Sequence, residues 1–297
     1  MIRVPSSEGV SVAVHELGGD RTAPTLLISH ATGFHSHCYT PLAARLVDRF
    51  RCVGVDYRGH GETDVDPDWS VDWRRFGDDA EAVARHVAPA GGLVGFGHSM
   101  GGAALLMAAH RDPDRFERLV LFEPISHQAS SASMTEAEIR DLPIVTGALR
   151  RRRRFTSFDE AYSNFRAKPP LSLMVDDALH DYVDHGFRRV PIDDGSDRTE
   201  LELRCPPELE AAIFVTGVSN GVWDLLPEIP TPTLVLGGRI EERQPSSQSE
   251  AIAGHLTDGT YVCLDHQTHF GPFSHPGEVA DLIADFAAAG SDRSPGR

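Results

Sequence analysis

The sequence predicts an α/β fold, in which helices flank a mostly parallel β-sheet. Short apolar or β-branched runs recur along the chain, and the segments between them repeat apolar residues at helical spacing. Alternation of such strands and amphipathic helices is typical of a parallel sheet that is covered on both faces. The expected strands are residues 10–14, 25–29, 51–56, 93–96, 119–122, 233–236 and 260–264, and the expected helices are residues 42–47, 74–87, 100–110, 248–256 and 278–287.

The middle of the chain breaks this alternation. Residues 124–227 contain helix-like segments and no clear strand, which predicts a helical insertion that forms a cap over one edge of the sheet. The core is then expected in two parts, residues 1–123 and residues 228–289. Residues 290–297 are rich in Gly, Ser, Asp and Pro and are predicted to be a disordered tail.

Composition narrows the classes of function. The 297 residues include 28 basic and 44 acidic side chains, and the formal charge of −16 disfavours binding to nucleic acid. The four cysteines form no Cys-x-x-Cys pair, and the N-terminus has no signal-peptide pattern, so a cytoplasmic protein is expected. No apolar run approaches the roughly 20 residues that span a bilayer. The histidines lack metal-ligand spacing, and we expect a small-molecule substrate with neither a metal nor a cofactor.

The strongest single feature is Gly-His-Ser-Met-Gly at residues 97–101, which fits Gly-x-Ser-x-Gly. An expected strand runs into the motif and an alanine-rich helix runs out of it, so Ser99 is predicted to lie on a tight turn that lifts its hydroxyl above the sheet. The amino end of the helix favours negative charge developing there. Ser99 is therefore the predicted nucleophile, the alternative being a glycine-rich turn that only joins strand to helix.

Together with other motifs, this feature resembles the α/β-hydrolase superfamily over residues 10–287. His-Ala-Thr-Gly-Phe at residues 30–34, Asp-Tyr-Arg-Gly-His-Gly at residues 56–61 and a late histidine match in the same order. The resemblance implies an α/β-hydrolase fold with the insertion as its variable cap. It also implies that His269, in the loop after the last strand, is the general base, with His266 and His275 as its rivals.

The resemblance leaves three candidates for the acid that orients the base. Glu241 is preferred, because it lies where relatives carry an aspartate after a late strand, although glutamate is longer. Glu242 would serve if that loop were one residue longer. Glu123 directly follows the strand at residues 119–122, where some relatives carry the acid. Each of the three could instead be a solvated loop carboxylate, for example one paired with Arg239.

An acyl transfer also needs amides that stabilise the oxyanion. The Met100 amide, directly after the nucleophile, is one predicted donor. The resemblance implies Thr32 as the other, and Ala31 stands where relatives usually have glycine, which allows a different loop path. Residues 34–39 are expected at the mouth of the pocket, and the arginines at residues 150–154 are interpreted as a solvated helix face.

These residues predict a cofactor-free serine hydrolase that acts on an ester of a small or medium-sized carboxylic acid through an acyl-enzyme. Cleavage of a carbon–carbon bond, a lactone or an amide by the same triad stays open, because the same groups support each reaction. The alternative of another class is a ligand-binding protein on the same fold, with an idle triad.

Overall fold

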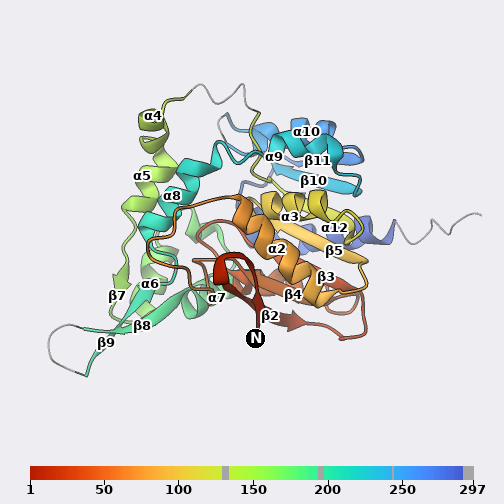
Figure 1. Cartoon of the computed structure of the whole chain (residues 1–297). Coiled ribbons are helices and arrows are strands. Elements are labelled where there is room, and N and C mark those ends of the chain that lie inside the picture. The colour runs from red at the N-terminus through yellow and green to blue at the C-terminus, as the bar shows by residue number, and fades with distance from the viewer. Residues whose placement is uncertain (129–133, 193–196, 243, 290–297) are drawn as a thin grey trace, which may run out of the picture.

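A central β-sheet organises the computed structural model, which describes residues 1–128, 134–192, 197–242 and 244–289. Within these residues, eight strands pair in the order β1-β2-β4-β3-β5-β6-β10-β11 (Figure 1). Strands β4, β3, β5, β6, β10 and β11 pair in parallel. The pairs β1–β2 and β2–β4 are antiparallel. The predicted mostly parallel sheet is confirmed. The strands are β1 Ile2–Pro5, β2 Ser11–Gly18, β3 Thr25–Ser29, β4 Arg51–Asp56, β5 Leu93–His98, β6 Phe116–Phe122, β10 Thr233–Gly238 and β11 Gly259–Leu264.

Alternate side chains of the strands pack into two apolar cores, one on each face of the sheet. In β3, Leu27 belongs to one core, whereas Leu26 and Ile28 belong to the other, as the two-residue period of a strand requires. Helices α2, α3 and α10 complete the first core, and α1, α11 and α12 complete the second. These helices are α1 Thr40–Ala43, α2 Arg74–Val87, α3 Met100–Arg111, α10 Ser246–His255, α11 Gly271–Ser274 and α12 Pro276–Ala288.

The chain between β6 and β10 forms the inserted region (Figure 1). It is largely helical, but the expectation that it lacks strands is wrong, because β7, β9 and β8 form a small antiparallel sheet. These strands were not predicted because their charged residues interrupt the apolar pattern. Glu202 on β9 accepts hydrogen bonds from Arg154 and Arg188 on the neighbouring strands. The elements are α4 Glu136–Arg140, α5 Pro143–Leu149, β7 Arg154–Phe155, α6 Phe158–Arg166, α7 Asp176–His185, β8 Phe187–Pro191, β9 Thr199–Leu203, α8 Pro207–Gly217 and α9 Val222–Leu225.

Two further differences from the predicted elements have local causes. The helix expected at residues 42–47 ends at Ala43, after which tighter i→i+3 bonds such as Leu46 N to Ala43 O take over. Strand β1 was not predicted because it has only four residues and lies at the sheet edge. The predicted tail, residues 290–297, lies outside the described residues. No described helix combines the length and apolarity that a bilayer crossing requires.

Candidate active site

Ser99 occupies the turn between β5 and α3. Its backbone has φ 56° and ψ −116°, a conformation that L residues other than glycine rarely adopt. The turn needs small neighbours. A Cβ on Gly97 would lie 2.6 Å from the Gly102 Cα, and a Cβ on Gly101 would lie 2.7 Å from the His30 carbonyl oxygen. The Gly-x-Ser-x-Gly motif thus forms the predicted strand–turn–helix geometry, at the carboxyl end of β5.

His269 contacts His98, the residue before Ser99, with ring centroids 4.8 Å apart, and it also contacts a buried carboxylate. Its Nδ1 is 2.6 Å from Glu123 Oε2, and the Glu123 side chain is almost completely buried. The other carboxylate oxygen, Oε1, accepts a hydrogen bond of 2.8 Å from the Gly238 amide. A carboxylate oxygen accepts, so the His269 Nδ1–H group donates this hydrogen bond to Glu123. In that tautomer, Nε2 carries the lone pair of the ring.

The structure therefore moves the candidate acid from Glu241 to Glu123. The Glu241 side chain is 47% exposed and accepts a 2.7 Å hydrogen bond from Arg239, the ordinary surface pairing that was the alternative for it. Glu242 is also exposed. Sheet register explains the difference. The last residue of β10 contributes the Gly238 amide to the site, whereas the carboxylate belongs to Glu123, which directly follows the adjacent strand β6.

The backbone is strained at both Ser99 and Glu123. Ser99 and Glu123, with φ values of 56° and 45°, are two of the three non-glycine residues with positive φ in the described chain, the other being Glu8. Each is held by a backbone bond to the next strand, Ser99 N to Phe122 O at 3.0 Å and Glu123 N to Leu236 O at 2.8 Å. Such conformations cost of order 1–3 kcal/mol and cluster at active sites. The sequence gives no signal for the strain at Glu123.

Thr32 and Met100 are the two predicted oxyanion donors. Both residues are buried, and neither amide donates a hydrogen bond to any residue that the structure describes. The loop before Thr32 is braced by His30, whose Nε2 accepts from the Tyr57 amide at 3.0 Å and whose Nδ1 therefore donates to the Ala31 carbonyl at 2.8 Å. Burial lowers the pKa of His30 to about 4, which keeps this ring neutral.

A hydrogen-bonded chain that sequence reasoning missed joins two loops. One is the loop of residues 30–34, here called the oxyanion loop after its predicted role, and the other is the loop of residues 265–270 that holds His269, here called the base loop. The Ala31 amide donates to the Tyr39 hydroxyl at 3.1 Å, and this hydroxyl therefore donates to His98 Nδ1 at 2.8 Å. His98 Nε2 in turn donates to the His269 carbonyl at 2.9 Å. Burial depresses the pKa of His98, so its ring stays neutral and its two nitrogens keep distinct roles. Tyr39 was expected only as part of the stretch at the pocket mouth.

The aromatic residues near the site divide between wall and core. Phe34 contacts Phe270 and Tyr182, with ring centroids 5.8 Å and 5.4 Å apart, and so forms an apolar wall next to His269. In the inserted region, Phe155 is fully buried against its neighbours, in the ordinary core role.

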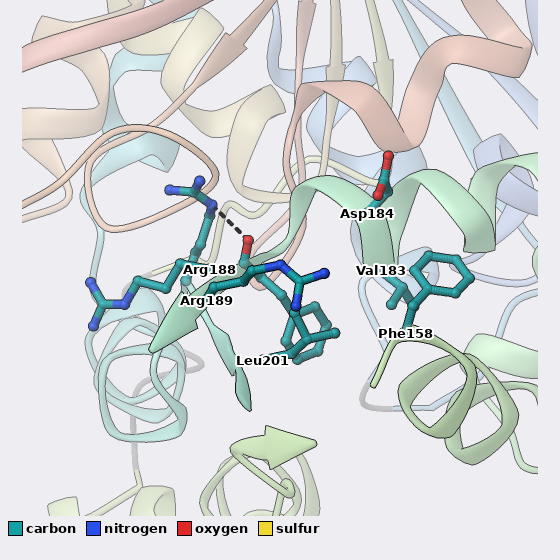
Figure 2. A pocket seen from close by; sticks show the side chains of 8 residues that line it. Phe158, Val183, Asp184, Arg188, Arg189 and Leu201 are labelled. Atoms are coloured by element: carbon teal, nitrogen blue, oxygen red, sulfur yellow. Dashed lines mark hydrogen bonds between the residues drawn. The ribbon is translucent and has the colours of Figure 1, made fainter. Parts of the chain in front are cut away.

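A separate pocket of about 300 Å³ lies in the inserted region (Figure 2). Figure 2 shows Val183 and Asp184 of α7 across this pocket from Arg189 of β8. Its lining contains none of the predicted catalytic or oxyanion residues. It is therefore distinct from the site around Ser99.

Comparison with known proteins agrees with this geometry. Residues 26–282 match the model of the Alpha/beta hydrolase family. The chain belongs to this family. It is 26% identical to the pimeloyl-[acyl-carrier protein] methyl ester esterase of Methylococcus capsulatus over 269 residues, 90% of this chain and 95% of that protein.

A second relative is similar over a shorter stretch. The chain is 32% identical to the 2-(acetamidomethylene)succinate hydrolase of Mesorhizobium japonicum over 114 residues, 38% of this chain and 39% of that protein. The crystal structure of E-2-(acetamidomethylene)succinate hydrolase superposes with a TM-score of 0.76 at 22% identity, over 97% of this chain and 98% of that one. The predicted α/β-hydrolase fold with an inserted helical region is confirmed, and the protein is a hydrolase of this family.

Proposed function

We propose that this α/β-hydrolase cleaves carboxylic esters through a serine acyl-enzyme, with Ser99 as nucleophile, His269 as base and Glu123 as acid. The observation that carries the proposal is the 2.6 Å contact between His269 Nδ1 and the buried Glu123 carboxylate, beside the strained turn of Ser99. The similarity to a methyl ester esterase over 90% of the chain supports an ester as the substrate.

In the first half-reaction, the Ser99 hydroxyl oxygen attacks the ester carbonyl carbon while its proton moves to His269 Nε2. The negative charge that forms on the carbonyl oxygen is stabilised by the Thr32 and Met100 amides and by the amino end of α3. The imidazolium is stabilised by Glu123. Collapse of the tetrahedral intermediate breaks the bond to the alcohol oxygen, which leaves with the proton of His269.

In the second half-reaction, water attacks the acyl-enzyme and transfers a proton to His269. The bond to Ser99 then breaks, the carboxylic acid is released, and the proton returns to the Ser99 oxygen. The hydrogen-bonded chain through Tyr39 and His98 would keep the oxyanion loop and the base loop in register during both steps.

A pre-steady-state experiment tests this proposal. With p-nitrophenyl acetate, the wild-type protein should release close to one equivalent of p-nitrophenol in a burst before slower turnover. Ser99→Ala should abolish the burst, and His269→Ala should slow acylation by about 10³-fold or more. His266→Ala is the matched control, because His266 is an exposed histidine of the same loop that pairs with Glu278 at 2.8 Å. Turnover that survives in Ser99→Ala would contradict the proposal.

A further inference from the structure

Arg151 does not fit the solvated helix face expected at residues 150–154. This stretch follows the end of α5 and is not helical. The side chains of Arg152, Arg153 and Arg154 are about half exposed; Arg152 pairs with Glu160, and Arg153 and Arg154 pair with the buried Glu202. Arg151 differs: its side chain is only 17% exposed, and it forms a 2.5 Å ion pair with Glu210, whose side chain is 9% exposed.

This buried pair lies directly over the oxyanion loop. Gly33, the residue after Thr32, has φ 80°, and a Cβ built on it would lie closest to the Glu210 carboxylate oxygen Oε1, 3.0 Å from the Glu210 carboxyl carbon and 3.3 Å from Arg151 Nη1. Adding one C–C bond places Nη1 no more than about 5 Å from the Gly33 Cα, and so within about 9 Å of the Thr32 Cα. This upper limit is within the reach of a short acid chain whose carbonyl is held at Thr32.

The same side chains also connect Arg151 to the base. Arg151 Nη2 contacts the Tyr182 hydroxyl, and the ring of Tyr182 packs against Phe34. Phe34 in turn contacts Phe270, the neighbour of His269. Arg151 and His269 are thus joined by one wall of aromatic side chains, which would contact the methylene groups of a bound acid chain.

Arg151 retains hydrogen-bonding capacity for a ligand. A guanidinium has five N–H donors in a planar fork that matches a carboxylate. Among the residues that the structure describes, its side-chain hydrogen-bond acceptors are Glu210 and Tyr182. A buried Arg–Glu pair adds little net stability, because desolvation offsets the attraction, so the stability of the fold does not by itself account for a guanidinium at this place.

A second buried polar group, His60, has one ring nitrogen without a hydrogen-bond partner among the described residues. His60 is fully buried, its Nδ1 bonds the Arg58 carbonyl at 3.1 Å, and its Nε2 has no hydrogen-bond partner among the described residues. Burial lowers the pKa of His60 to about 3, and the positive charge of Arg151 contributes to the same direction. An unpaired buried nitrogen is costly and is usually explained by a bound ligand or water.

We infer that Arg151 is a substrate-binding residue, and that the preferred substrate is a monoester of a short dicarboxylic acid whose free carboxylate binds the Arg151 guanidinium while its ester carbonyl lies between Thr32 and Met100. The inference rests on the proposed ester hydrolysis at Ser99. Glu210 orients the guanidinium and balances its charge. The arginines at residues 152–154 lack this role because their side chains are about half exposed.

Two esters of matched shape test the inference. In monomethyl succinate a carboxylate stands where methyl 4-methylpentanoate has an isopropyl group, and proton release in a pH-stat reports both reactions. Wild-type kcat/KM should favour monomethyl succinate, and Arg151→Gln should lower it for this ester by about 30- to 100-fold, with less than a threefold change for the neutral ester. Succinate should also inhibit p-nitrophenyl acetate hydrolysis competitively, and about 30- to 100-fold more weakly in Arg151→Gln.

Control variants separate substrate binding from a structural role. Arg152→Gln removes a neighbouring exposed arginine and should leave kcat/KM for both esters unchanged. Glu210→Gln breaks the same ion pair but keeps the cation, so it should preserve the preference for the charged ester. If Arg151→Gln and Glu210→Gln lower activity equally on both esters, Arg151 only supports the fold, and thermal unfolding of each variant should then show matching losses.

The two proposals fail in different ways. Wild-type protein that cleaves the neutral ester at least as well as monomethyl succinate, and that succinate does not inhibit, would overturn the role of Arg151 and leave ester hydrolysis standing. Wild-type protein that shows no burst with p-nitrophenyl acetate and cleaves neither methyl ester would overturn the proposed function, and the inference with it.

Discussion

Replacing Glu123 by glutamine should disable the base through its tautomer. The Gly238 amide donates to Glu123 Oε1 at 2.8 Å, so the glutamine must place its carbonyl oxygen there and its NH₂ group opposite His269 Nδ1. His269 then accepts at Nδ1 and carries its proton on Nε2, where it cannot take a proton from Ser99. The opposite orientation of the amide leaves two buried donors facing each other, which costs roughly 1–3 kcal/mol for each unsatisfied group.

The expected loss is therefore that of a wrongly protonated base. We predict a fall in kcat of about 10³- to 10⁴-fold, equivalent to about 4–5.5 kcal/mol of transition-state stabilisation, with KM changed by less than threefold. Glutamine has nearly the shape of glutamate, so the loss should occur without global unfolding.

Steady-state kinetics with p-nitrophenyl acetate, together with thermal unfolding, provide the measurement. Glu241→Gln is the matched control. Its carboxylate is 47% exposed and pairs with Arg239 at the surface, a contact worth about 0–1 kcal/mol, so kcat should stay within twofold. The reasoning is refuted if Glu123→Gln retains activity within threefold of wild type, or if Glu241→Gln loses as much as Glu123→Gln.

Two further predictions concern the groups around the triad. Tyr39→Phe removes the hydroxyl between the Ala31 amide and His98. We expect the free energy of unfolding to fall by about 1–3 kcal/mol and kcat to fall by about 10- to 100-fold, with little change in KM. An unchanged kcat would show that this hydrogen-bonded chain does not position the loop that holds His269. Burial lowers the pKa values of His30, His35 and His60 to about 4, 3 and 3, so the unfolded chain takes up protons that the folded chain does not. Stability should therefore fall as the pH drops from about 6.5 towards 4, by up to about 4 kcal/mol per pH unit if all three contribute, and a urea midpoint that stays constant over this range would contradict the assignment.

Sequence reasoning predicted the sheet and the nucleophile because both are encoded locally. The apolar runs, the Gly-x-Ser-x-Gly turn around Ser99 and the helix after it depend on neighbouring residues, and the structure has them at the predicted places. Thr32 and His269 followed from motif order within the family resemblance. Their catalytic roles remain predictions, although the structure places His269 against His98, the residue before Ser99.

The acid could not be chosen from the sequence, because the choice depends on which strand ends lie side by side. Glu123 and Glu241 both follow strands of the parallel sheet, and only the three-dimensional path of the two loops decides which carboxylate reaches His269. The burial of Arg151 was not predicted from the sequence for a similar reason. Its partner Glu210 lies 59 residues away along the chain, and a run of arginines carries no mark of the one that is buried.

The central claim, an activated serine at residue 99, is tested most directly by covalent labelling. Wild-type protein treated with a fluorophosphonate should gain one phosphonyl group, and peptide mapping by mass spectrometry should place it on Ser99. The label should be absent from Ser99→Ala and strongly slowed in Glu123→Gln, with Glu241→Gln labelled like wild type. A folded wild-type protein that takes no label, or a label that maps to another residue, would contradict the account.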